Sequence, residues 1–265
     1  MSGRMGIYSQ AAGGEVKFLD AYSGAGAAYS LESLSNSTTN VIKARRSSDN
    51  AELDFTALDI TDGTLTTWTG ANDGFVTTIY DQVNSNNMTQ TTSSKQGKIV
   101  SSGSVITLGG KACIERSTSD YGGYISTYDP NDGAAVKGMY YVGDNNSKRG
   151  TIFGSLSGVR DYGFFVTLGS SNAKVDDRPT ITASKINGLT NAPATRGESY
   201  TATDKHFLMY REIEFNFQYA SLALGYRFTS VSSFGMLTFQ EMVIFLNTTD
   251  SAAKQANINS RYSIY

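Results

Sequence analysis

The chain contains very little cysteine, histidine and proline: one cysteine, one histidine and three prolines in 265 residues. The single cysteine, Cys113, excludes an internal disulfide. The single histidine, His206, excludes a multi-histidine metal site and any Ser-His-Asp triad built without it. No apolar run approaches the roughly 18 residues of a membrane span, and the first residues lack the apolar stretch of a signal peptide. We therefore predict a protein made in a cytoplasm, with no membrane partner.

An excess of charge of either sign is also missing. The formal net charge is −2, from 22 basic and 24 acidic residues. The basic residues are scattered, apart from Lys43, Arg45 and Arg46, so the sequence has no basic stripe that would neutralise a phosphate backbone. We predict neither DNA nor RNA as a partner, and no cofactor.

Glycine (27 residues), tyrosine (16) and phenylalanine (13) are plentiful. Aromatic residues and threonine favour half-buried pleated surfaces, and glycine with asparagine supplies the positive-φ positions of tight turns. Short alternating or β-branched runs separated by Gly, Ser and Asn are typical of a two-sheet β-sandwich or jelly roll. The predicted strands are 41–45, 52–55, 74–80, 99–100, 105–108, 112–114, 137–142, 151–153, 163–168, 180–183, 206–212, 214–225 and 235–246.

The length suits one domain of this kind. Residues 1–17 are small and polar, so we predict an N-terminal arm followed by a single domain at 18–265. Within that domain, 18–34 is predicted to be a short helical or turn-rich segment, and 64–68 to be either a short helix or a strand.

A helix is predicted at the end of the chain. Asp250 is a suitable N-cap for a helix over 251–260. The spacing of four residues places them on one face that can pack on the sandwich. These residues are Ala253, Ala256, Ile258 and Tyr262.

Four short segments share their order and spacing with a known family: R-R-S-S-D at 45–49, I-Y-D-Q at 79–82, T-L-G-G-K-A at 107–112 and G-M-Y at 138–140. They resemble the catalytic domain of the B-type α-L-arabinofuranosidases. The same segments also resemble uncharacterised concanavalin-like proteins of tailed bacteriophages and marine bacteria, in which the closing A-N-I-N-x-x-Y helix recurs. The resemblance implies a concanavalin A-like β-sandwich (jelly roll) with a short C-terminal helix.

The carboxyl groups of the resembled family are missing at the matching positions. Retaining glycosidases need two carboxyl groups about 5 Å apart. The family's nucleophilic Glu segment, with its vicinal disulfide, corresponds to 151–157, which holds no acidic residue and no cysteine. Its acid/base Asp segment corresponds to 224–229, where Thr229 or a neighbour replaces the aspartate. We therefore predict that the chain is not an enzyme.

The other chemically active residues have structural interpretations. Cys113 lies in an alternating segment and is predicted to be a buried thiol. His206 is predicted to be a partly buried residue at a strand start, and Glu241 a buried, hydrogen-bonded carboxylate. Asp81 and Gln82 are predicted to satisfy backbone groups after a strand.

Two groups of loop residues offer weaker binding sites. Asp176-Asp177 and Asp129-Asn131-Asp132 are oxygen-rich but lack the spacing of a calcium loop, so no metal site is predicted.

Three tyrosines are closely spaced within 120–128. If they are exposed, Tyr121, Tyr124 and Tyr128 could stack on sugar rings or anchor a protein interface. The alternative is ordinary sheet packing.

Two functional hypotheses follow. The first is a non-catalytic bacteriophage virion protein, such as a capsid decoration, head fibre or tail-associated protein, forming homo-oligomers and contacting other virion proteins, with surface glycans as a further ligand. Its assembly contacts are assigned to Arg4, Met5, Ile7 and Tyr8 of the arm. The alternative is a carbohydrate-binding module, or a glycoside hydrolase with relocated catalytic carboxylates.

Overall fold

The computed structural model describes twelve ranges of the chain, and all structural statements below concern these. They are residues 16–115, 123–129, 136–144, 150–151, 153–156, 162–163, 166–167, 181–189, 206–214, 221–224, 238–247 and 251–265.

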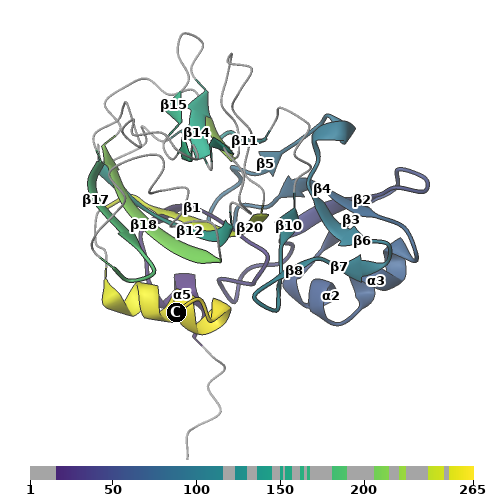
Figure 1. Cartoon of the computed structure of the whole chain (residues 1–265), viewed down its shortest axis with the longest axis horizontal. Coiled ribbons are helices and arrows are strands. Elements are labelled where there is room, and N and C mark those ends of the chain that lie inside the picture. The colour runs from purple at the N-terminus through teal and green to yellow at the C-terminus, as the bar shows by residue number, and fades with distance from the viewer. Residues whose placement is uncertain are drawn as a thin grey trace, which may run out of the picture.

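The described elements are mostly short antiparallel strands with a few helices (Figure 1). In chain order they are α1 (Phe18–Ala21), β1 (Ala25–Ser30), β2 (Ile42–Arg46), β3 (Glu52–Phe55), α2 (Ala57–Thr61), α3 (Thr64–Thr69), β4 (Gly74–Ile79), β5 (Met88–Thr89), a 3₁₀ turn (Ser93–Lys95), β6 (Lys98–Ser101), β7 (Ser104–Val105), β8 (Thr107–Leu108), β9 (Lys111–Ala112), β10 (Ile114–Glu115), β11 (Tyr124–Ser126), β12 (Val136–Asp144), β13 (Gly150–Thr151), β14 (Phe153–Leu156), β15 (Tyr162–Gly163), β16 (Val166–Thr167), β17 (Ile181–Ile186), β18 (Phe207–Glu214), β19 (Ser221–Leu224), β20 (Thr238–Phe245) and α5 (Ala252–Tyr262).

One continuous sheet forms the frame, in the order β15-β14-β19-β11-β5-β4-β6-β10-β20-β12-β18-β17, with β1 on β20, β2 on β4, β3 on β2 and β7 on β6. The sheet turns back on itself, so that a half made of long strands (β1, β12, β17, β18, β20) faces a half made of shorter ones (Figure 1). This architecture is an all-β sandwich with a short C-terminal helix, as the sequence predicted.

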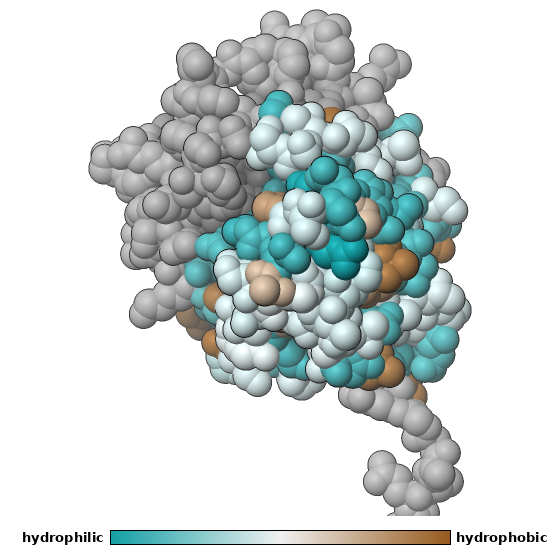
Figure 2. Space-filling model, turned by 90° about the vertical axis from the view of Figure 1, so that its right-hand side faces the viewer, coloured by the Kyte–Doolittle hydropathy of each residue, from teal (hydrophilic) through white to brown (hydrophobic). Residues whose placement is uncertain are grey.

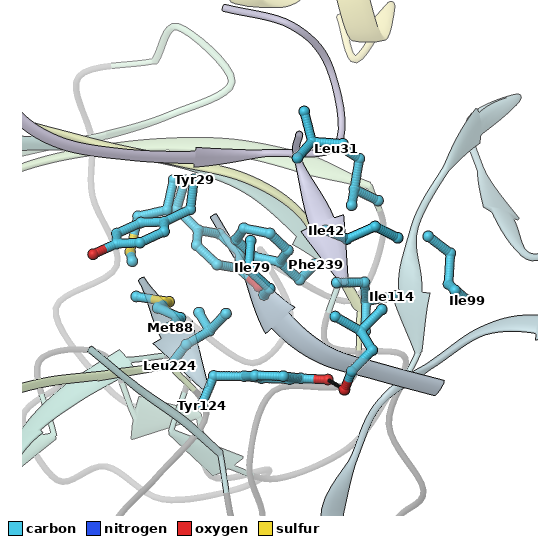
Figure 3. Packing of buried hydrophobic residues seen from close by; sticks show 14 of the residues in the cluster. Tyr29, Leu31, Ile42, Ile79, Met88, Ile99, Ile114, Tyr124, Leu224 and Phe239 are labelled. Carbon is cyan, nitrogen blue, oxygen red and sulfur yellow. Dashed lines mark hydrogen bonds between the residues drawn. The ribbon is translucent and has the colours of Figure 1, made fainter. Parts of the chain in front are cut away.

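The core lies between the two halves. Tyr29, Phe239 and Met209 of the long strands pack in one cluster with Ile79 and Leu224 of the short strands, all fully buried. Figure 3 shows Tyr29 and Phe239 converging with Ile79 and Leu224. Because one face of each strand lies in this cluster, the period-2 alternation of the sequence becomes an inside and an outside.

The long strands are buried on both faces. On β12, Met139 and Tyr141 lie in the inner cluster. Tyr140 and Val142 lie in a second cluster on the outer face, which α5 covers through Ile258 and Tyr262. The terminal helix thus shields apolar residues that would otherwise face water.

The face of α5 differs in part from the prediction. Ile258 and Tyr262 are buried as predicted, but Ala253 and Ala256 are exposed, and Lys254 and Gln255 are buried instead. The N-cap is Ser251 rather than the predicted Asp250: its side chain accepts a hydrogen bond from the Lys254 backbone N–H. Asp250, the predicted cap, lies outside the described residues.

The N-terminal third contains two short helices. Residues 64–68 belong to helix α3 rather than to a strand. The sequence analysis did not predict α2, although Thr56 and Asp59 form a reciprocal capping box at its start. Residues 18–34 divide into helix α1 and strand β1, so the helical or turn-rich prediction holds only for the first part.

Candidate functional site

The two segments that match the catalytic segments of the resembled family lie side by side. Strands β14 and β19 pair antiparallel, with Phe153 opposite Leu224, Gly154 opposite Ala223, and Ser155 opposite Leu222. Among the described residues of the two strands there is no carboxyl group. The fold therefore pairs the described part of 151–157 with the strand that ends at Leu224, while Thr229, the position that corresponds to the family's aspartate, lies outside the described residues.

Strand β11 continues this part of the sheet and contains one predicted ligand-binding tyrosine. Tyr124 is opposite Leu224 of β19 and is fully buried. Its hydroxyl donates to the Val76 carbonyl at 2.8 Å and accepts from the Gly97 N–H at 2.9 Å. The ligand-binding role suggested for Tyr124 is therefore wrong, because its ring lies in the core and its hydroxyl links Val76 of β4 to Gly97 (Figure 3).

Tyr128 is also buried, with 2% of its surface exposed, and belongs to the inner core cluster. A ring in this position cannot stack on a sugar, so the ligand-binding role suggested for it is wrong as well. Tyr121 lies outside the described residues. Ordinary sheet packing, the alternative interpretation, describes Tyr124 and Tyr128.

Asp81 organises the turn after β4, as predicted. Its carboxylate accepts hydrogen bonds from the backbone N–H groups of Ala28 (2.9 Å) and Val83 (3.1 Å). Burial raises the pKa of this carboxyl, and the backbone hydrogen bonds oppose that rise. The carboxylate ties β1 to the turn.

Gln82 has a similar backbone role. Its amide oxygen accepts from the Leu34 N–H at 2.8 Å and from the Thr38 hydroxyl at 3.0 Å. Its amide nitrogen donates to the carbonyls of Ser30 (3.1 Å) and Glu32 (2.8 Å). Both N–H groups and both lone pairs of the amide are thus used.

A small surface pocket of about 140 Å³ lies between α1, the start of β1 and the Asp81 turn. Asp20, Tyr22, Ser23 and Gln82 contribute its polar lining. The Asp20 carboxylate accepts from the Ser35 hydroxyl at 2.7 Å and twice from Asn36. These hydrogen bonds lower the pKa of Asp20, that from Ser35 most of all, so the group is a carboxylate at neutral pH.

On the outer face of the long strands, Glu241 is fully buried and forms an ion pair with Arg261 of α5. The Arg261 Nη2 group donates to the second carboxylate oxygen at 2.7 Å. The hydroxyls of Ser30 (3.0 Å) and Tyr262 (3.1 Å) complete its surroundings. This arrangement confirms the predicted buried, hydrogen-bonded carboxylate and fastens α5 to β20.

His206 and Cys113 match their structural interpretations. His206 directly precedes β18, is partly buried, and has a pKa lowered mainly by burial. Cys113 is 1% exposed, and burial raises the pKa of its thiol to about 12. The Cys113 thiol is therefore protonated at neutral pH and is not a nucleophile.

The described ranges contain no group of three or more His, Cys, Asp or Glu side chains that could hold a metal ion. Of the oxygen-rich stretches, Asp129 is described, but Asn131, Asp132 and Asp176-Asp177 lie outside the described residues.

The assembly-arm residues cannot be placed in the fold. Arg4, Met5, Ile7 and Tyr8 lie outside the described residues, so their role in assembly stays a prediction. The same applies to the virion partners and the oligomeric state.

Two solved structures are similar to this chain. One is a GH54 α-L-arabinofuranosidase soaked with a cyclic sulfate inhibitor, with 15% identity, a TM-score of 0.55, and 90% of this chain and 62% of that chain covered. The other is an arabinofuranosidase complexed with arabinofuranosyl-α-1,2-xylobiose, with 15% identity, a TM-score of 0.56, and coverage of 92% and 64%. The likeness confirms the predicted arabinofuranosidase-like fold, and this chain spans less than two thirds of each enzyme's length.

No family model matches the sequence, and no curated protein does. In the part of the chain that the structure describes, no helix is long and apolar enough to cross a membrane.

Proposed function

We propose that this β-sandwich binds a carbohydrate without hydrolysing it. The observation that carries the proposal is the absence of a carboxyl group from 151–157 and 224–229, whose described parts belong to the paired strands β14 and β19. The carbohydrate part rests on the fold shared with two arabinofuranosidases, one of them in complex with an arabinofuranosyl xylobiose.

Strand spacing makes the missing carboxyls informative. Neighbouring strands lie about 4.8 Å apart, close to the roughly 5 Å that separates the carboxyl groups of a retaining glycosidase. Carboxylates at facing positions of β14 and β19 would therefore stand at a catalytic distance. The facing residues here are Phe153 with Leu224 and Ser155 with Leu222, which cannot transfer a proton or attack a sugar carbon.

The pocket beside α1 is our proposed place for a sugar ring. Tyr22 offers an aromatic surface with a polar tip. Asp20 accepts three hydrogen bonds, and a carboxylate has about four acceptor positions, so one remains for a sugar hydroxyl. The volume of about 140 Å³ limits the occupant to one small ring.

The test compares turnover and binding on the same ligands. Arabinoxylan and a chromogenic aryl arabinofuranoside are incubated with the protein, and released sugar is measured. Binding of arabinoxylo-oligosaccharides is followed by calorimetry. We expect binding with no turnover above the buffer control. Turnover would establish a hydrolase with relocated carboxylates, and absence of binding would reject the carbohydrate function and favour the assembly hypothesis.

Matched variants locate the binding site. Tyr22→Ala is expected to weaken binding about three- to tenfold through loss of the ring contact, while Tyr80→Ala, a partly exposed tyrosine outside the pocket, should leave it unchanged. Asp20→Asn serves as a second pocket variant if Tyr22→Ala lowers the thermal midpoint. Equal binding by wild type and both pocket variants would place the sugar elsewhere.

A further inference from the structure

The side chain of Arg45 is fixed by three neutral neighbours. On the exposed face of β2, its Nε donates to the Gln96 amide oxygen at 2.7 Å and its Nη1 donates to the Asn50 amide oxygen at 2.7 Å. The guanidinium lies over the Phe75 ring, 4.9 Å from its centroid. Lys98 approaches the same ring at 5.6 Å.

The charge of Arg45 is not matched by a carboxylate. Within the described ranges no acidic oxygen forms an ion pair with it, whereas Arg46 pairs with Asp49 at 2.6 Å and Arg261 pairs with Glu241. A guanidinium has five N–H donors. Arg45 uses two of them in the printed hydrogen bonds, which leaves one on Nη1 and both on Nη2.

The groups that hold Arg45 are themselves held. Gln96 is 8% exposed, and its amide nitrogen donates to the Gln90 carbonyl at 3.0 Å, so its oxygen is turned toward Arg45. Asn50 has a φ of 58°, in the left-handed region that non-glycine residues rarely adopt. Asn tolerates this conformation in turns, and the turn places its amide oxygen against Arg45.

We propose that Arg45 is a carboxylate-binding site for an acidic glycan. The end of the guanidinium, with free donors on Nη1 and Nη2, fits both oxygens of a uronic acid carboxylate side by side. The stacking on Phe75 and the two amide contacts fix the guanidinium before the ligand arrives, which lowers the entropy cost of binding. This inference rests on the proposed carbohydrate function and adds a second contact for an acidic group on β2, apart from the pocket beside α1, which Arg45 does not line.

The surroundings of Arg45 set the limits of the site. Figure 2 shows the side of the molecule that carries β2 and β3, where the described surface is mostly hydrophilic. Glu52 is opposite Arg45 in the register of β2 and β3. Its carboxylate is exposed and opposes an anionic ligand. Lys98 is paired with Asp73 at 2.7 Å, so it adds little net charge.

The test uses two ligands that differ in one group. The first is an arabinoxylo-oligosaccharide with a glucuronic acid side group, and the second is the same oligosaccharide with that carboxyl reduced to an alcohol. Calorimetry at low salt measures both dissociation constants. We expect wild type to bind the acidic form about tenfold or more tightly, because a charged, bidentate contact is lost on reduction.

Four variants assign this preference. Arg45→Gln should remove it, and Arg45→Lys should remove most of it because the fork is lost while the charge stays. Glu52→Gln should strengthen acidic-ligand binding about two- to threefold by removing a nearby negative charge. Lys43→Gln is the matched control on the same strand. Lys43 pairs with Asp54 at 3.8 Å, so the preference should persist.

The outcomes separate the two proposals. Equal affinity of wild type for both ligands would overturn the acidic site and leave carbohydrate binding intact. A preference for the acidic ligand that persists in Arg45→Gln would have the same meaning. Binding of neither ligand would overturn the carbohydrate function itself. If Arg45→Gln fails to fold, the two ligands on wild type and the Glu52→Gln variant still decide.

Discussion

Two arginines mark two regions of opposite character. Arg261, in the terminal helix, forms an ion pair with the buried Glu241. The helix covers the outer face of the long strands. Arg45, on β2, is held by two amides and an aromatic ring, and within the described ranges it forms no ion pair. An arginine thus stabilises the fold in the first region, and an arginine is available for binding in the second. What differs is the contact: Arg261 forms an ion pair with Glu241, whereas no ion pair joins Arg45 to Glu52, its neighbour in the register of β2 and β3.

Removing Arg261 should give the largest effect. Arg261→Ala leaves Glu241 buried without its cation, and we expect a loss of about 3–5 kcal/mol in the free energy of unfolding. Urea denaturation measures it. Lys111→Ala, which breaks the exposed pair with Glu32, should cost at most about 1 kcal/mol. Similar losses of unfolding free energy for the two variants would show that the ion pair of Arg261 with Glu241 is as accessible to water as the surface pair.

The core hydroxyl of Tyr124 should come next. Tyr124→Phe leaves the Val76 carbonyl and the Gly97 N–H without their shared partner, at a cost of about 1–3 kcal/mol. Tyr80→Phe, whose hydroxyl bonds the exposed Asp54, is the control and should change stability by less than about 0.5 kcal/mol. A neutral Tyr124→Phe would mean that the hydroxyl does not join the strands in solution.

The buried carboxylate of Asp81 predicts a pH dependence. Its pKa lies above the unfolded value of 3.8, with burial as the largest cause. A raised folded-state pKa adds stability below that value, and this contribution is lost as pH rises through the folded pKa. The stability of wild type relative to Asp81→Asn should therefore fall as the pH rises above the unfolded value of 3.8. A difference that grows with pH would show that the backbone hydrogen bonds outweigh burial.

The smallest stability effect is expected at Asn50. Asn50→Gly removes the amide contact to Arg45 but relieves the positive φ of 58°. These opposing terms should leave stability within about 0.5 kcal/mol, while the preference for the acidic ligand declines because Arg45 loses one support. An unchanged preference, measured with the two matched oligosaccharides, would assign Asn50 to the turn alone.

Short-range patterns predicted much of the fold. The β-branched and aromatic residues predicted a strand at 74–80, which the structure shows as β4 at 74–79. The side chains of Asp81 and Gln82 were expected to serve nearby backbone groups, which they do. Both predictions depend on residues whose roles follow from local geometry. The buried Glu241 was predicted as well, because Phe239 and Val243 alternate around it.

Long-range register decided the rest. Tyr124 and Tyr128 follow a glycine pair and left two interpretations open, ligand binding and sheet packing; the pairing of β11 with β5 and β19 and the burial of both rings decide for packing. Likewise, the cluster of basic residues at 43–46 is visible in the sequence. Their partners cannot be predicted in this way, because they depend on the turn between β2 and β3. In the structure Arg45 contacts the Asn50 amide, and Arg46 contacts Asp49.

Strand β20 has a consequence for how the protein is made. It pairs with β1, β10 and β12, so residues 238–245 join a strand near the start of the chain to two from its middle. The ribosome synthesises these residues after β1, so β1 has no β20 to pair with until residues 238–245 have emerged. We expect little native structure during synthesis, and a period in which the nascent chain depends on chaperones.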